Sequence, residues 1–141
     1  MSNILITGGC GFVGYNLVKK LTEDDHKIIV IDKKIKNKLQ NVTYINSLTS
    51  DKQYWESELN HFNFEPDVVF HLGEYSKVTP SFTDTKDILD SNYIGTYEVL
   101  EYCKDKNVKL VYAASSTKHS EDSGNESPYS FSKKKNVELI K

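Results

Sequence analysis

Two short segments at opposite ends of the chain carry residue types that could do chemistry. The first is the glycine-rich run from Gly8 to Gly14, and the second contains Tyr129 and Lys133, four residues apart. Residues with this spacing lie on one face of a helix, so the Lys133 ammonium would lie close to the Tyr129 phenol. A free phenol has a pKa of about 10, and a nearby positive charge lowers it. The pair is therefore a candidate for proton transfer to or from a hydroxyl group.

The glycine-rich run follows a short apolar strand and precedes a helical pattern, which is the setting of a dinucleotide-binding turn. Gly8 allows the tight turn, Gly11 lets the backbone approach a pyrophosphate, and Gly14 lets the helix pack closely on the sheet. The start of that helix would present unpaired N–H groups to the anion. Because the chain contains no arginine, backbone amides, lysines and hydroxyls must bind the phosphates.

Asp32 ends the next apolar strand, about twenty residues beyond the glycines, where a carboxylate can accept hydrogen bonds from adenosine ribose hydroxyls. The same carboxylate would repel a 2′-phosphate, so the sequence predicts NAD rather than NADP as cofactor. The neighbouring Lys33, Lys34 and Lys36 weaken that preference.

The elements that must hold these segments alternate between strands and helices. Apolar runs predict strands at Ile4–Thr7, Lys27–Asp32, Val42–Ile45, Asp67–Leu72 and Val108–Ala113. Helical periodicity predicts helices at Phe12–Leu21, Asp51–Phe62 and Asp87–Lys106, and from Pro128 to the end of the chain. Such alternation gives a parallel sheet with helices on both faces, and right-handed crossovers favour the strand order 3-2-1-4-5. We therefore expect one doubly wound, Rossmann-like α/β domain over residues 1–141.

Composition argues against several classes of function. The 18 basic and 20 acidic residues nearly cancel, so neither nucleic acid nor an acidic membrane is an expected partner. Cys10 and Cys103 are far apart in the sequence, which predicts two reduced thiols and no metal site. No apolar run is long enough to span a bilayer, and glycines end the first apolar run too early for a signal peptide. These features predict a cytoplasmic protein.

Several motifs in order along the chain give it a resemblance to a known family. Besides the glycine turn and Asp32, they are Pro66–Leu72, Asn92–Thr96, Ala113–Ser116 and the Tyr129-x-x-x-Lys133 pair. Together they resemble the short-chain dehydrogenase/reductase family. More narrowly, the chain is similar to the extended branch of NAD-dependent nucleotide-sugar epimerases and dehydratases, such as the UDP-glucose 4-epimerases.

The resemblance implies a catalytic triad of Ser115, Tyr129 and Lys133. In the family, the tyrosinate takes a proton from a substrate hydroxyl while hydride passes to NAD, and the serine orients the substrate oxygen. Ser116 is the alternative to Ser115 if the register slips by one residue. The cofactor contacts that the resemblance implies are Gly8, Gly11, Phe12, Val13, Gly14, Asp32, Lys33, Ser47, Leu48, Leu72, Gly73, Ser76, Asn92, Tyr129 and Lys133.

The sequence departs from the family pattern in four places. Ser47 stands where the family usually has an aspartate at the adenine, and Glu74 places a bulky acid near the expected nicotinamide region. The loop from Ser115 to Tyr129 is short. The chain stops eight residues after Lys133, so we expect it to lack the family's C-terminal substrate domain.

Two functions remain open. The first is a minimal NAD-dependent epimerase, dehydratase or other oxidoreductase that uses the Ser-Tyr-Lys triad on a small molecule, with a nucleotide-sugar as the first candidate. The second is a non-catalytic NAD(H)-binding module or the cofactor half of a split enzyme, which Glu74 and the missing substrate domain favour. A purely structural oligomer is least favoured because the glycine turn and Asp32 are intact.

The resemblance also implies a homodimer or higher oligomer. In the family, the long helix matching Asp87–Lys106 and the helix carrying Tyr129 and Lys133 pair with their copies in a partner subunit. We expect the tyrosine-rich face of Asp87–Lys106 to lie in this interface.

Overall fold

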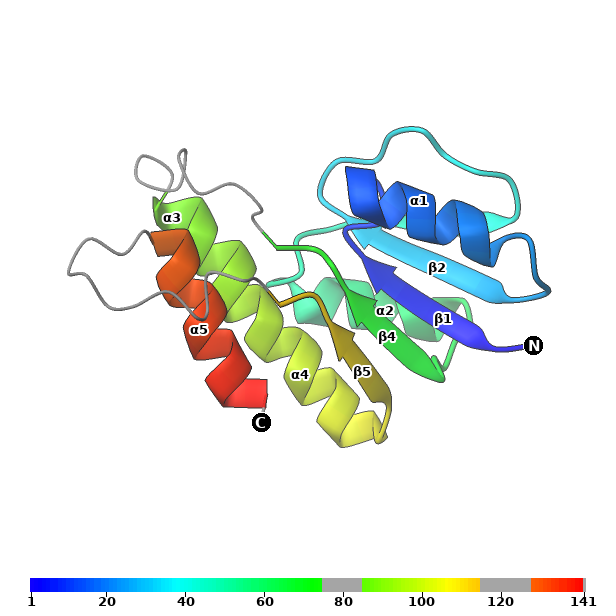
Figure 1. The fold of residues 1–141 in the computed structure, drawn as a ribbon. Helices are drawn as coiled ribbons and strands as arrows, with labels where there is room; N and C mark the ends of the chain where they lie inside the picture. The colour runs from blue at the N-terminus through cyan, green and yellow to red at the C-terminus, as the bar shows by residue number, and fades with distance from the viewer. Residues whose placement is uncertain (75–84, 115–127, 141) are drawn as a thin grey trace.

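Five parallel strands form a single sheet in the computed structural model, which describes residues 1–74, 85–114 and 128–140 (Figure 1). The strands are β1 (Asn3–Thr7), β2 (Lys27–Asp32), β3 (Val42–Asn46), β4 (Val68–His71) and β5 (Lys109–Tyr112). Their order is β3-β2-β1-β4-β5, and every neighbouring pair is parallel. The predicted Rossmann-like order is therefore confirmed.

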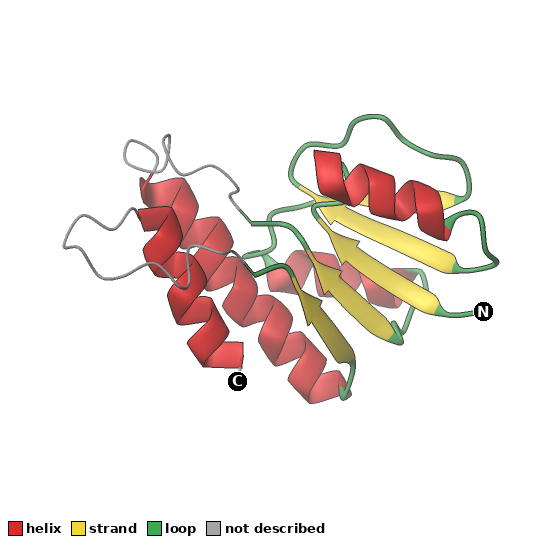
Figure 2. Cartoon of the chain, viewed as in Figure 1, coloured by secondary structure: helices red, strands yellow, loops and turns green. Residues whose placement is uncertain are grey.

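Helices cover both faces of this sheet (Figures 1 and 2). They are α1 (Phe12–Leu21), α2 (Lys52–His61), α3 (Thr85–Ile88), the π-helical segment η2 (Leu89–Ile94), α4 (Gly95–Lys106) and α5 (Pro128–Ile140). Helix α1 packs on one face, whereas α2 and α4 pack on the other. Helix α5 contacts α3 and η2, so it extends the α4 layer. None of the helices in the described ranges is long and apolar enough to cross a membrane.

The core follows from the alternation of side chains along buried strands. In β2, Ile28 and Val30 pack under α1, while Ile29 and Ile31 face α2 and α4. All four are buried, as expected for a parallel strand covered on both faces.

The helix predicted over Asp87–Lys106 is not one regular α-helix. It starts two residues earlier, at Thr85, and the π-helical segment η2 interrupts it between α3 and α4. Such a segment shifts the phase of the residues that follow it. Tyr102 is only 3% exposed and packs edge to face on Trp55 at 5.1 Å, whereas Tyr93 and Tyr97 are exposed. Tyr102 follows Tyr97 by five residues in α4, which puts the two side chains on different sides of a regular helix.

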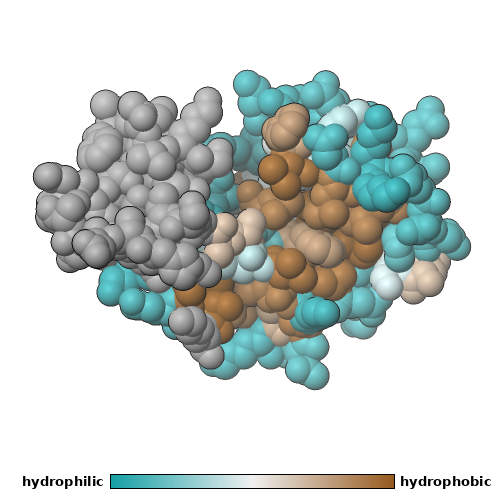
Figure 3. Space-filling model, viewed as in Figure 1, coloured by the Kyte–Doolittle hydropathy of each residue, from teal (hydrophilic) through white to brown (hydrophobic). Residues whose placement is uncertain are grey.

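One part of the sheet is less well covered within the described ranges. On the α1 side, Val68 and Phe70 of β4 are only partly buried, and Val111 of the edge strand β5 is 37% exposed. Val111 pairs with Phe70, so their side chains share this face. Figure 3 shows a hydrophobic area across the middle of the same side of the molecule.

Candidate functional site

A pocket of about 430 Å³ opens beyond the carboxyl ends of the strands, a size within the range of roughly 300–1,000 Å³ common for ligand sites. It lies where the chain order reverses, since β1 has β2 on one side and β4 on the other. In doubly wound sheets this crevice is the usual place for a ligand. The predicted cofactor contacts that line it are Gly8, Gly11, Phe12, Val13, Gly14, Asp32, Lys33, Ser47, Leu48, Leu72, Gly73 and Lys133.

The remaining predicted residues have other positions. Ser76 and Ser115, together with the alternative Ser116, lie outside the described residues. Tyr129 is on the first turn of α5, but its side chain lies outside what the structure describes. Asn92 is fully buried in η2 and is not among the lining residues. Its amide nitrogen donates to Ser132 Oγ at 3.1 Å, so it connects η2 to α5.

The glycine turn is shaped by close backbone contacts. Gly8 has a φ of +74°, and a Cβ there would lie 2.7 Å from backbone atoms of Leu72 and Gly73. A Cβ on Gly14 would lie 2.8 Å from Gly9 Cα and closer still to Gly8 O. By contrast, a Cβ on Gly11 would have 3.5 Å to its nearest neighbour. Close packing therefore requires glycine at positions 8 and 14, whereas Gly11 faces the pocket with room beside it.

Helix α1 starts at this turn with features that suit an anion. Its N-cap is Gly11, no side chain caps it, and its first turn contains no acidic residue. The first N–H groups of a helix have no partner within the helix, and the helix dipole adds positive potential there. Backbone groups at the start of α1 can therefore bind phosphate without an arginine.

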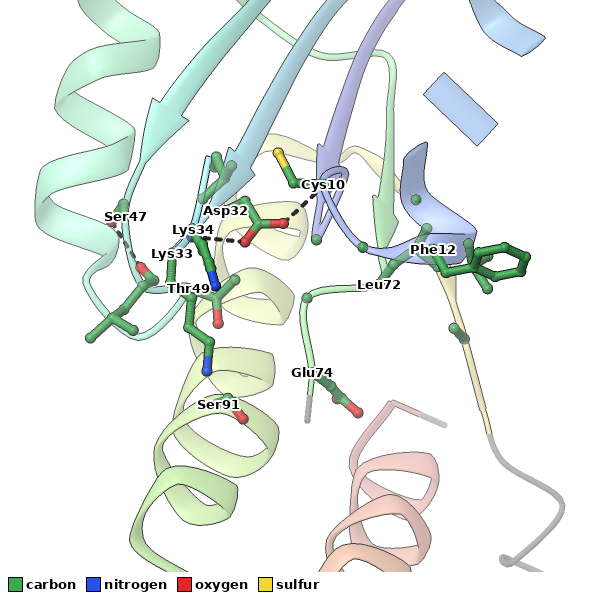
Figure 4. A pocket seen from close by; sticks show the side chains of 18 of the residues that line it. Cys10, Phe12, Asp32, Lys33, Lys34, Ser47, Thr49, Leu72, Glu74 and Ser91 are labelled. Carbon is green, nitrogen blue, oxygen red and sulfur yellow. Dashed lines mark hydrogen bonds between the residues drawn. The ribbon is translucent and has the colours of Figure 1, made fainter. Parts of the chain in front are cut away.

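Asp32 closes one end of the pocket in a fixed orientation. Its Oδ2 accepts the backbone N–H of Cys10 at 3.0 Å, and its Oδ1 accepts that of Lys34 at 3.0 Å (Figure 4). Each carboxylate oxygen has a further acceptor site, so the group can still bind hydroxyls. Ser47 lies at the same end, where its hydroxyl donates to Leu48 O at 2.9 Å.

The opposite end of the pocket contains a buried ion pair between Glu74, which follows β4, and Lys133 of α5. Lys133 Nζ lies 2.6 Å from Glu74 Oε2, and the two side chains are 7% and 3% exposed. Lys133 also donates to Ala113 O at 2.7 Å and lies 4.9 Å from the centre of the Tyr112 ring. The ammonium thus has a defined position at the ends of β4 and β5.

Neutral side chains from β5, α4 and α5 complete the surroundings of Glu74. The Tyr112 hydroxyl donates to Oε2 at 2.9 Å, and Asn136 Nδ2 donates to Oε1 at 3.0 Å. The Thr96 hydroxyl also donates to Oε1. Asn136 Nδ2 donates to the carbonyl of Asn92 as well, which ties this cluster to η2.

His71 links the cluster to the glycine turn without reaching the pocket. The side chain is completely buried, with Nδ1 2.6 Å from Thr7 Oγ1 and Nε2 2.7 Å from Thr96 Oγ1. Because the Thr96 hydroxyl donates to Glu74, the network assigns the Nε2 proton as the donor to Thr96. Thr7 Oγ1 in turn accepts the backbone N–H of Gly73 at 2.9 Å. His71 therefore supports the strand ends.

The surroundings of Glu74 determine its charge. Burial by itself would raise the pKa of the Glu74 carboxyl, but the nearby His71 ring, with Nε2 3.5 Å from Glu74 Oε1, and the ammonium of Lys133 outweigh it. They hold the pKa of Glu74 below its ordinary value, so the side chain is a carboxylate at neutral pH.

Sequence reasoning identified Glu74 only as a departure from a family pattern and missed its partners. Asn136 follows Lys133 by three residues, which places both on one face of α5 and was an available signal. The pairing of Glu74 with Lys133 carried no such signal, because the two residues are far apart in the sequence and meet only when α5 packs beside β4 and β5.

Nearly the whole of this sequence is similar to proteins of one known family. Residues 4–140 match the sequence model of the NAD dependent epimerase/dehydratase family. The chain is 34% identical to ADP-L-glycero-D-manno-heptose-6-epimerase of Brachyspira hyodysenteriae, over 92% of this chain and 45% of that protein. It is 35% identical to dTDP-D-glucose 4,6-dehydratase of Dictyostelium discoideum, over 81% of this chain and 29% of that protein.

Solved structures of epimerases superpose well on this chain, at lower sequence identity. The UDP-glucose 4-epimerase of Thermotoga maritima, solved with UDP-glucose, superposes with a TM-score of 0.84 at 26% identity, over 98% of this chain and 50% of that one. The UDP-glucose 4-epimerase of Thermus thermophilus, solved with NAD, gives 0.81 at 26% identity, over 98% and 49%. The chain therefore spans half or less of the length of these relatives.

Proposed function

The chain belongs to the NAD-dependent epimerase/dehydratase family, and from this membership we propose that its pocket binds NAD and serves the redox step of an epimerase or dehydratase. One observation carries the proposal: a single pocket joins Asp32, the open start of α1 and Lys133. These three features suit the ribose, the pyrophosphate and the nicotinamide half of one dinucleotide.

The residues that are present fit the cofactor. Asp32 would accept the adenosine ribose hydroxyls and favour NAD over NADP. The space above Gly11 and the first N–H groups of α1 would receive the pyrophosphate. Lys33, Ser47 and Leu48 would surround the adenosine, and Leu72, Gly73 and Lys133 would contact the other half. For Ser76 and Asn92, the two other predicted contacts, we propose only a supporting role at this site.

For the chemistry, we assign Tyr129 as the group that exchanges a proton with a substrate hydroxyl, Lys133 as its electrostatic support and Ser115 as the group that orients the substrate oxygen. Bound NAD would supply the hydride acceptor and donor. Support comes from α5, on which position 129 precedes Lys133 by four residues, the spacing that puts two positions on one face of a helix.

The proposed substrate is a small molecule, with nucleotide-sugars first, since relatives are named as an ADP-heptose epimerase and a dTDP-glucose dehydratase. The second candidate function is an NAD(H)-binding module or the cofactor half of a split enzyme. The Glu74–Lys133 ion pair favours it, because the pair reduces the positive charge available to Tyr129. Incubating the protein with NAD and UDP-glucose and separating the sugars by chromatography distinguishes them, since only the first predicts a converted sugar.

Asp32→Ala is expected to weaken NAD binding by about 10- to 100-fold, because each lost hydrogen bond to a charged group is worth about 1.5–3 kcal/mol. Titration calorimetry of wild type and variant measures the change. Asp105→Ala is the matched control, since Asp105 is an exposed acid of α4 that does not line the pocket. Equal NAD affinity in wild type and Asp32→Ala would contradict the assignment of Asp32.

We also propose a homodimer through η2, the start of α4 and the neighbouring α5. Exposed apolar side chains gather on the first two elements, namely Leu89, Tyr93, Ile94 and Tyr97. Contiguous exposed apolar residues of this kind commonly mark protein interfaces.

The double variant Ile94→Lys/Tyr97→Lys is expected to convert the dimer to a monomer, because it places two charges in the apolar contact. Light scattering at micromolar protein concentration measures the mass. Tyr54→Lys on α2 is the control, since it changes an equally exposed tyrosine elsewhere. A monomeric wild-type protein would rule out this interface.

A further inference from the structure

We propose that Glu74 sets the redox preference of the pocket, because its carboxylate cancels the charge of Lys133 and lets the site accept NAD⁺ as readily as NADH. This inference rests on the proposed binding of NAD, and it assigns to Glu74 a positioning and electrostatic part in that site. Its basis is the buried Glu74–Lys133 pair at one end of the pocket. Figure 4 shows Glu74 at the end of the pocket away from Asp32.

The ion pair lies where the second half of a dinucleotide would reach. Asp32 ends β2, the glycine turn follows β1, and Glu74 follows β4, so the three lie in order along the carboxyl edge of the sheet. Glu74 and Lys133 both line the pocket. A dinucleotide with its ribose at Asp32 and its pyrophosphate at Gly11 would place the nicotinamide near this pair.

The nicotinamide ring carries a positive charge in NAD⁺ and none in NADH. A single ammonium beside the ring would therefore oppose NAD⁺ and leave NADH almost unaffected. Two like charges a few ångströms apart repel strongly in a partly buried site, where water screens them poorly, so even a weakened repulsion matters. At 2.6 Å from Lys133, the Glu74 carboxylate removes most of that repulsion.

The carboxylate is held in place independently of the lysine. Tyr112, Thr96 and Asn136 each donate a hydrogen bond to it, and these residues come from β5, α4 and α5. Besides Asp32 and Glu74, Asp90 also lines the pocket, and its carboxylate accepts the Ser50 hydroxyl at 3.0 Å. Because Glu74 is the acid paired with Lys133, it is the group whose neutralisation should change the preference.

The experiment measures the dissociation constants of NAD⁺ and NADH for wild type and Glu74→Gln by titration calorimetry. Glutamine keeps the shape of the side chain and removes its charge. We expect the ratio of the NAD⁺ constant to the NADH constant to rise about tenfold in Glu74→Gln, which corresponds to about 1.4 kcal/mol. Asp32→Ala is the control, because a lesion at the ribose weakens both forms by the same factor. A purely structural role for Glu74 would likewise leave the ratio unchanged.

The double variant Glu74→Gln/Lys133→Gln removes both charges and leaves no lone buried ion, so it keeps the inference testable if the single variant does not fold. We expect its ratio of the NAD⁺ to the NADH dissociation constant to stay within about threefold of wild type. If Glu74 did not cancel Lys133, the double variant would lose a net positive charge, and this ratio would fall because NAD⁺ would bind more tightly. An unchanged ratio in Glu74→Gln would overturn the inference alone. Failure of wild type to bind either form would overturn the proposed function as well.

Discussion

Gly14→Ala is expected to cost more than about 4 kcal/mol of folding free energy, which places it among the most damaging single substitutions. The added Cβ would lie 2.8 Å from Gly9 Cα and 2.9 Å from Gly8 C, and closer still to Gly8 O. All three atoms belong to the backbone, so no side chain can move aside to relieve the overlap. Relief would require α1 to move away from the end of β1. Urea unfolding followed by circular dichroism measures the loss.

Gly11→Ala is the matched control three residues earlier in the same turn. Its Cβ would meet only Gly8 O at 3.5 Å, an ordinary contact, and Gly11 has a φ of −77° that alanine adopts readily. We expect a loss of less than about 1 kcal/mol, mainly because alanine is a poorer N-cap than glycine. Similar losses for both variants would show that close packing of α1 on the turn does not explain the glycine at position 14.

Lys133→Met is expected to destabilise the protein by about 3–5 kcal/mol at neutral pH, because it leaves the buried carboxylate of Glu74 without its ion-pair partner. Methionine has a similar length, so the main change is the loss of charge. Urea unfolding at neutral pH gives the difference in stability.

The same variant should respond differently to acid. In wild type the pKa of Glu74 is lower in the folded than in the unfolded protein, so its contribution is complete above the unfolded pKa. That contribution is lost as pH falls through the folded pKa. Removing Lys133 raises the folded pKa toward the unfolded one, so Lys133→Met should lose less stability on acidification than wild type.

The control for this pH dependence is Glu74→Gln/Lys133→Met, in which position 74 no longer titrates. Its stability should change with pH only through the other carboxyl groups. Parallel stability–pH curves for wild type and Lys133→Met would contradict the assignment of an ionised Glu74–Lys133 pair.

The sequence was informative where function depends on residues close together in the chain. The spacing of Gly8, Gly11 and Gly14 and the position of Asp32 predicted one half of the pocket, since a strand, a turn and a helix place them almost unaided. Apolar runs likewise predicted the five strands, and handedness rules then predicted their order.

The other half of the pocket depends on contacts between distant segments. The π-helical segment η2 is an irregularity that apolar periodicity does not show, so one continuous helix was expected over Asp87–Lys106. The pairing of Glu74 with Lys133 joins the end of β4 to α5, and the sequence around neither residue predicts this contact. Predicting such a contact requires the packed structure.

The strand order also bears on how the protein is made. β1 leaves the ribosome before the other four strands of the sheet, yet it ends at the centre of the sheet between β2 and β4. Until Val68–His71 is synthesised, a nascent sheet of β3, β2 and β1 leaves the edge along the apolar Ile4–Leu5–Ile6 unpaired. Open apolar edges invite pairing with other chains, so this interval of translation is when the nascent protein most needs a chaperone.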